Sequence, residues 1–191
     1  MVTNNRIPFF SASYVITALR AGPYKDTMWA LAELLDNSIE ALSFINKILL
    51  IEDFHPTTRR RVLNQIAVLD CGIGMTKDLL TESVSFGRGS HLNQSSSTKY
   101  KFGKLGKYGI GLPQSSVSQA TKVEVWSWTK GKGINKSLYT YLDVNEIIKG
   151  SHDIVPEPIL KSIPNNILKL ALDNEKETEA FSESGTLVLW S

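Results

Sequence analysis

The segment 33–40 holds three carboxylates and one amide within eight residues. Glu33 and Asn37 are four residues apart, so on a helix they lie on one face, with Asp36 and Glu40 beside them. A carboxylate can accept a proton, and an amide oxygen can bind a metal ion. The grouping therefore fits a site in which a proton acceptor lies next to a metal ligand. For Asp36 and Glu40 we favour a simpler interpretation, a solvated helix surface.

A second pattern, Asp-Cys-Gly-Ile-Gly-Met at 70–75, directly follows an apolar run. The carboxylate at the end of a predicted strand can accept a hydrogen bond from an exocyclic amine. The two spaced glycines allow a tight turn and a close approach of the backbone to a flat ligand. An ordinary turn between a strand and a helix explains the same residues equally well. This pattern alone therefore does not distinguish a ligand-binding loop from a turn.

Two further glycine patterns follow along the chain. Gly106-Lys107-Tyr108-Gly109-Ile110-Gly111 precedes a predicted helix, and the N–H groups of a helix start can bind phosphate. It is not a Rossmann fingerprint, because its spacing differs and no strand leads directly into it. Gly185-Thr186 stands before the last predicted strand and carries almost no information by itself.

The elements that must position these residues follow from apolar periodicity and turn signals. Along 26–44 the recurrence of Met28, Leu31, Leu35, Ile39 and Leu42 predicts a helix with these side chains toward the core. Segment 87–106 lacks periodicity and is predicted as a long loop that can act as a lid. Runs of strands with helices to one side indicate an α+β fold. We predict helices at 11–20, 26–44, 76–84, from 106 and at 164–173, and strands at 48–54, 62–69, 122–129, 136–143 and 187–190.

Composition narrows the class of protein. A chain of 191 residues, with 42% hydrophobic and 21% charged residues, is typical of one soluble globular domain covering 1–191. The net charge of +2 does not indicate binding to nucleic acid or to a membrane surface. One cysteine, Cys71, excludes an internal disulfide and fits a reducing compartment. No signal peptide or membrane-length apolar run is present, so we expect a cytoplasmic (intracellular) location. Trp126 and Trp128, on one face of a predicted strand, are interpreted as packing residues.

Taken in order, the four patterns resemble the ATP-binding domain of the GHKL superfamily, which includes gyrase-type topoisomerases, ninety-kilodalton heat-shock chaperones, sensor histidine kinases, MutL and MORC proteins. The resemblance covers about 10–190. The first motif is closest to the MORC and type VI topoisomerase versions, and the second to the chaperone version. The implied fold is a two-layer α/β sandwich (Bergerat fold) with a mixed, mostly antiparallel sheet, helices on one face, and an ATP lid at 87–106.

The resemblance also implies a role for each matching residue. Glu33 would be the catalytic residue that polarises the attacking water, and Asn37 would bind Mg²⁺. Asp70 would accept from the adenine amino group, which excludes guanine, and Thr186 would support Asp70 through water. Either Lys104 or Lys107 would add a phosphate contact. The implied ATP-binding residues are Asn37, Asp70, Gly72, Ile73, Gly74, Met75, Lys104, Gly106, Lys107, Tyr108, Gly109, Gly111 and Thr186.

The implied activity is Mg²⁺-dependent ATP hydrolysis in a conformational switch, MORC-like or chaperone-like. Segment 1–20 would be the dimer-exchange arm of an ATP-dependent homodimer. The chain would be the N-terminal part of a longer protein, in which a following transducer domain or a partner supplies a basic residue. MORC proteins have a lysine soon after the third motif, whereas Pro113 and Gln114 occupy that region here.

Two other functions stay open. One is a nucleotide-sensing interaction domain with little hydrolysis. The other is a catalytic domain of the histidine-kinase type, against which the first motif argues, because those kinases usually lack the catalytic glutamate. The sequence does not indicate the client of the switch, whether DNA, a protein or a defence partner, and nothing in it points to a membrane.

Overall fold

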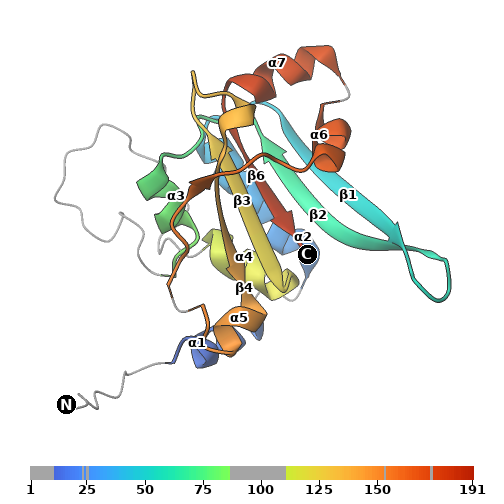
Figure 1. Ribbon diagram of the computed structural model, residues 1–191, viewed down its shortest axis with the longest axis vertical. Coiled ribbons are helices and arrows are strands. Elements are labelled where there is room, and N and C mark those ends of the chain that lie inside the picture. Colours follow the sequence, from blue (N-terminus) through green and yellow to red (C-terminus); the bar gives the residue numbers. More distant parts are fainter. Residues whose placement is uncertain (1–10, 23, 25, 87–110, 153, 173) are drawn as a thin grey trace.

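The computed structural model describes residues 11–22, 24, 26–86, 111–152, 154–172 and 174–191, with the backbone alone at 175 and 176. Its centre is a six-stranded sheet in which every described strand pair is antiparallel. The spatial order is β1-β2-β6-β3-β4-β5, so the last strand of the chain lies inside the sheet (Figure 1). The strands are β1 (Asn46–Phe54), β2 (Arg61–Asp70), β3 (Lys122–Trp128), β4 (Leu138–Asp143), β5 (Ile159–Leu160) and β6 (Gly185–Trp190).

The helices begin where the sequence supplies an oxygen for their first N–H groups. Ser11, Asp26, Thr76 and Asp143 each accept from the first turn of the helix that follows. Thr76 begins the helix that the sequence predicted at 76–84. The helices are α1 (Ala12–Arg20), α2 (Thr27–Glu40), α3 (Lys77–Ser83), α4 (Gly111–Gln119), α5 (Val144–Ile148), α6 (Asn165–Ala171) and α7 (Glu175–Glu183), with a short 3-10 turn at Ile134–Lys136.

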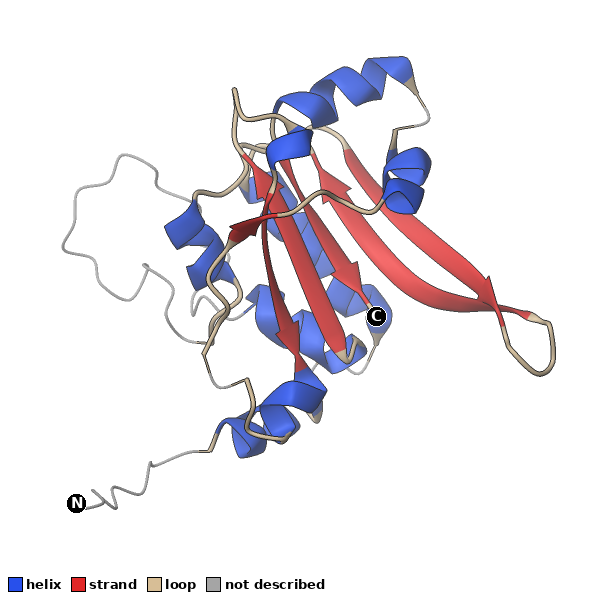
Figure 2. Cartoon of the chain, viewed as in Figure 1, coloured by secondary structure: helices blue, strands red, loops and turns tan. Residues whose placement is uncertain are grey.

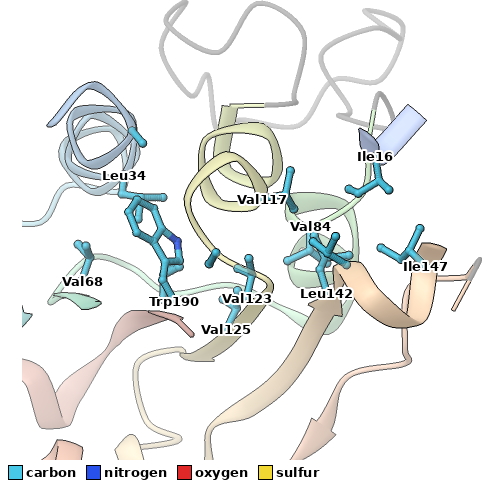
Figure 3. Packing of buried hydrophobic residues seen from close by; sticks show 14 of the residues in the cluster. Ile16, Leu34, Val68, Val84, Val117, Val123, Val125, Leu142, Ile147 and Trp190 are labelled. Atoms are coloured by element: carbon cyan, nitrogen blue, oxygen red, sulfur yellow. The ribbon is translucent and has the colours of Figure 1, made fainter. Parts of the chain in front are cut away.

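One face of the sheet carries the first five helices. The core of this layer contains Ile16 of α1, Leu34 of α2, Val117 of α4 and Ile147 of α5 (Figure 3). These side chains pack against every second residue of the strands, including Trp190. Burying such a set of aliphatic side chains is the main source of stability for this layer. The α+β sandwich predicted from the sequence is confirmed.

The opposite face carries α6 and α7, which adds to the prediction of helices on one face (Figure 2). Trp126 and Trp128 point into this second layer and are 0% and 1% exposed, so they are packing residues, as predicted. Trp128 Nε1 donates to the carbonyl of Phe181 in α7 at 2.8 Å. Lys47 Nζ donates to the carbonyl of Ala171 at the end of α6 at 2.8 Å. Side chains of the sheet thus fasten both helices to it.

The prediction of which α2 side chains face the core was wrong in part. The buried line is Ala30, Leu34 and Ser38, whereas Met28, Ile39 and Leu42 are mainly exposed, and Leu31 and Leu35 lie at the edge of the core. The buried line is rotated by about 100° from the predicted apolar stripe. Small side chains at 30 and 38 let the helix approach the sheet closely, and this contact decides the orientation.

Most predicted elements are present, with three additions. The sequence did not predict the short α5, the helix α7 or the two-residue β5. Residues 55–60 connect β1 to β2, and the far end of this hairpin projects beyond the other strands (Figure 1). The predicted lid at 87–106 and residues 1–10 of the predicted arm lie outside the described residues. No helix among the described residues is long and apolar enough to cross a membrane.

Candidate functional site

A row of buried polar side chains lies at one end of strands β2, β6 and β3, on the sheet face that carries the first five helices. Asp70 of β2 pairs with Thr186 of β6, which pairs with Ser127 of β3. Two residues further along the same strands, Val68, Val188 and Val125 form a matching apolar row. The three polar residues are 7%, 7% and 0% exposed. We call Asp70, Thr186 and Ser127 the polar row.

The Asp70 carboxylate is held by three donors. Oδ1 accepts from the N–H groups of Gly72 at 2.9 Å and of Thr186 at 3.2 Å. Oδ2 accepts from the Ser38 hydroxyl of α2 at 3.3 Å. Burial raises the pKa of Asp70 to about 6, although these hydrogen bonds oppose the rise. The hydrogen bonds therefore fix the orientation of the carboxylate, while burial holds its pKa well above the usual range for aspartate.

The other two members of the row bond to each other. The hydroxyls of Thr186 and Ser127 are 3.0 Å apart, and Ser127 Oγ also accepts from the Met75 N–H at 2.8 Å. Thr186 thus contacts Asp70 through its backbone N–H, while its hydroxyl faces Ser127. The sequence motifs did not indicate a role for Ser127 or Ser38. The signal for Ser127 was a serine at a position where strand alternation calls for an apolar side chain.

The 70–75 loop returns toward α2 after the row. The Ile73 N–H donates to the carbonyl of Ala41 at 2.9 Å, and the Ile73 side chain is 37% exposed. The Met75 side chain is half-buried against the core. Gly74 has φ +69°, and a Cβ there would lie 2.0 Å from the carbonyl oxygen of Trp128. No other residue fits at this position without moving β3.

A second polar centre lies near the middle of α2. Glu33 Oε2 lies 3.0 Å from the position that a Cβ on Gly111, the first residue of α4, would occupy. Burial raises the pKa of Tyr24 to about 12, and the nearby Glu33 carboxylate adds to the rise. The Glu33 carboxylate therefore lies between Tyr24 and the start of α4.

Asn37 lies one turn beyond Glu33 on α2. Its Nδ2 atom is buried and has no hydrogen-bond partner among the described residues. A half-turn of the amide exchanges its nitrogen and oxygen, so the same position can offer an oxygen to a cation. Glu40 is half-buried rather than solvated, with a buried Oε1 that likewise has no described partner, while Asp36 is exposed as predicted.

The described part of the chain holds no group of three or more His, Cys, Asp or Glu side chains that could bind a metal ion by themselves. Mg²⁺ commonly uses one or two protein oxygens and completes its shell with substrate phosphates and water. The unpartnered amide of Asn37 fits such a shared site, in which a nucleotide supplies the remaining ligands.

Helix α2 connects the two centres. Ser38, which contacts Asp70, lies five residues beyond Glu33, a rise of about 7.5 Å along the helix. Nine of the predicted site residues are described, and all of them lie around these two centres. The other five fall outside the described residues: Lys104, Gly106, Lys107, Tyr108 and Gly109.

Comparison with known proteins shows the family to which this chain belongs. A family model described as histidine kinase-, DNA gyrase B- and HSP90-like ATPase matches residues 24–178, which is most of the chain. A search of curated proteins gave no match. The matched range contains both polar centres except for Thr186. The chain therefore belongs to the GHKL family of histidine kinase-, DNA gyrase B- and HSP90-like ATPases.

Proposed function

We propose that this chain binds ATP with Mg²⁺, hydrolyses it, and acts as a nucleotide-driven conformational and dimerisation switch of the MORC-like or chaperone-like type. The observation that carries the proposal is the placement of two centres on one helix. Ser38 contacts the buried Asp70, and Glu33 lies beside the first residue of α4. The centre around Asp70 suits an adenine base. The centre around Glu33 suits phosphates and water.

Asp70 is the proposed adenine-binding residue. An ionised carboxylate accepts the hydrogen bond that the adenine amino group donates, whereas guanine presents an oxygen at the same place. Because Asp70 is 7% exposed and fixed by three donors, it has little freedom to adapt to guanine. A mismatched pair of acceptors in such a buried site costs enough free energy to exclude the wrong base.

Glu33 is the proposed general base for hydrolysis. Water would attack the γ-phosphorus in line with the leaving ADP oxygen, and the Glu33 carboxylate would orient this water and accept its proton. The N–H groups at the start of α4 would face the phosphates. The Asn37 amide oxygen would hold Mg²⁺, which, when bound, offsets the charge of the phosphate oxygens.

The test is Glu33→Ala in the full chain, with Asp36→Ala as the matched control. Asp36 is an exposed carboxylate on the same helix. We expect Glu33→Ala to lower kcat by about 100-fold or more while the Kd for Mg·ATP changes little. Asp36→Ala should retain the wild-type kcat. Equal turnover in wild type and Glu33→Ala would remove Glu33 from the catalytic role.

A nucleotide-sensing domain with little hydrolysis is the second candidate. The complete set of donors around Asp70 favours it, because this centre can recognise a nucleotide without any contribution from Glu33. ATP binding measured together with turnover separates the two functions. Tight binding with no release of phosphate, in wild type and in Glu33→Ala alike, would support the sensor.

A further inference from the structure

Strand β1 is an edge strand, and its outer side pairs with no described strand (Figure 1). It runs for nine residues without a proline. The irregularity in its pairing with β2 falls at Asn64 of β2, so β1 itself contains no extra residue. Free N–H and C=O groups along so long an edge form a template on which another strand can pair.

The charged side chains of β1 do not protect this edge. Lys47 Nζ donates to a carbonyl at the end of α6, on the opposite face of the sheet from α2. Glu52 forms an ion pair with Arg61 of the neighbouring strand at 3.3 Å. Both charges are thus engaged within the chain. Between them, Ile48 and Leu50 are 42% and 62% exposed.

Ile48 and Leu50 lie on the sheet face that carries α2. In the register of the hairpin they pair with Val68 and Ile66, whose side chains belong to the core beneath this helix. Side chains of directly opposite residues point to the same face of a sheet. Helix α2 therefore covers β2 but leaves the middle of the edge strand uncovered.

An apolar stripe of α2 flanks the uncovered strand. The buried line of α2 separates this stripe from Glu33, which lies beside α4. Since α4 packs over β3 and α2 over β6 and β2, the side of α2 away from α4 is the side toward β1 (Figure 3). The stripe consists of Met28, Leu31, Leu35, Ile39 and Leu42. It forms one apolar surface with the middle of β1.

We propose that a second copy of this chain binds to this surface, with the two β1 strands pairing antiparallel about a two-fold axis at Leu50. In this register the Leu50 side chains of the two copies lie directly opposite each other. Leu49 of each copy lies opposite Ile51 of the other. The two sheets then form one continuous sheet, and an α2 stripe flanks the joined strands on each side. The contact does not depend on ATP and goes beyond the proposed function.

Charge favours a second copy over an unrelated partner. The hairpin end beyond β1 carries Arg59 and Arg60, which are exposed and whose side chains bond to no described residue. The other end of β1 follows the last turns of α2, where the helix carbonyls are negative and the exposed Asp36 likewise has no described partner. Antiparallel pairing brings the basic end of each copy toward the acidic end of the other.

The test is sedimentation equilibrium of the full chain without nucleotide. We expect a monomer–dimer equilibrium with a Kd in the micromolar range, so dilute protein is monomeric. Leu50→Lys places like charges opposite each other and removes apolar contact, so it should raise the dimer Kd by about 100-fold or more. The matched control is Leu160→Lys, at an exposed leucine of the other edge strand, β5, which should leave the dimer Kd unchanged. Both variants should keep the Tm of dilute wild type.

A cysteine at the two-fold axis tests the register. In Leu50→Cys the two Cβ atoms would lie about 5 Å apart, a separation that a disulfide spans after a small movement. Mild oxidation should therefore cross-link Leu50→Cys but not the control Leu160→Cys. The native Cys71 is buried, so wild type provides the background.

Three results would overturn the inference. They are a nucleotide-free wild type that stays monomeric up to about 100 µM, which leaves this surface to a different protein; a dimer that persists in Leu50→Lys, which assigns association to another surface; and equal cross-linking in the two cysteine variants. None of these measurements uses ATP, so the proposed binding and hydrolysis would stand or fall separately.

Discussion

The two polar centres on α2 differ in how completely the protein surrounds them. Asp70 is 7% exposed and receives hydrogen bonds from two backbone N–H groups and a serine. Glu33 is half-buried, and its carboxylate lies close to Gly111 at the start of α4. Protein donors already bond to the Asp70 carboxylate in the absence of a ligand. The Glu33 carboxylate, in contrast, can still accept hydrogen bonds from one.

This difference follows from what each centre is proposed to do. Selecting a base needs a rigid acceptor, because a mobile carboxylate could turn away from the wrong base at little cost. Assisting hydrolysis needs a carboxylate that can still reach a water, so full saturation by protein donors would lower its basicity. The same helix can serve both needs because about 7.5 Å of rise separates the two environments.

The largest expected effect on stability comes from glycine substitution in the 70–75 loop beside Asp70. In Gly74→Ala the new Cβ would lie 2.0 Å from the Trp128 carbonyl oxygen, at a φ of +69°. We expect a loss of at least about 3 kcal/mol in the free energy of unfolding, or a Tm lower by about 6–12 °C. Thermal unfolding followed by circular dichroism measures this.

Gly111→Ala is the counterpart at the other centre. Its Cβ would lie 3.0 Å from the end of a glutamate side chain, which can shift by a few tenths of an ångström. Stability should therefore change by less than about 1 kcal/mol, while turnover falls several-fold because Glu33 is displaced. Equal loss of stability in the two variants would show that the centres do not differ in rigidity.

The next effect concerns recognition at Asp70. Asp70→Asn keeps the size of the side chain but places an N–H₂ group among three donors and an adenine amino group. We expect the Kd for ATP to rise by about 10- to 100-fold, because a hydrogen bond to a charged group is lost and two donors face each other. Calorimetric titration with ATP measures this change, and ATP affinity equal to wild type would contradict the proposed adenine contact.

A smaller effect is a pH dependence with opposite signs for binding and stability. The pKa of Asp70 is raised from 3.8 to about 6, so folding disfavours the ionised form. The contribution of this group to stability is therefore largest below pH 3.8 and is lost as the pH rises to about 6. Binding of adenine, which uses the carboxylate, should instead weaken by up to about tenfold as the pH falls from about 7.5 to about 5.

The control for this pH dependence is the same measurement in Asp70→Asn. Phosphate groups of the nucleotide also titrate near pH 6 to 7, but they contribute equally to both proteins. The difference between wild type and variant should therefore isolate Asp70. Parallel pH curves for the two proteins would assign the dependence to the nucleotide alone.

The sequence predicted two members of the polar row, Asp70 and Thr186, but not the contact between them. Asp70 and Thr186 were found as parts of two motifs, but the backbone contact between them depends on β2 and β6 being neighbours with one register. Ser127 and Ser38 were not assigned roles, because serine is common and strand or helix position alone does not show what lies opposite. Long-range pairing is the missing information.

For α2, the sequence pattern did not identify which of two helix faces is buried. Apolar side chains at Met28, Ile39 and Leu42 suggested the core face, but Ala30, Leu34 and Ser38 occupy it. Periodicity measures hydrophobicity and does not measure how closely a helix must approach a sheet. The short side chains at 30 and 38 permit a close approach, which also brings Ser38 within reach of Asp70.

The smallest expected effect tests this account of α2. The helix is held through its buried line of Ala30, Leu34 and Ser38, so changes on its outer face should alter neither centre. Ile39 is 59% exposed, and Ile39→Ser should change the free energy of unfolding by less than about 0.5 kcal/mol and leave ATP affinity and kcat unchanged. Leu34→Ala, at 3% exposure, should cost about 2–5 kcal/mol in the same denaturant titration. If Ile39→Ser were as costly as Leu34→Ala, the apolar stripe would be buried after all, and Glu33 and Ser38 would have to face other neighbours than those described.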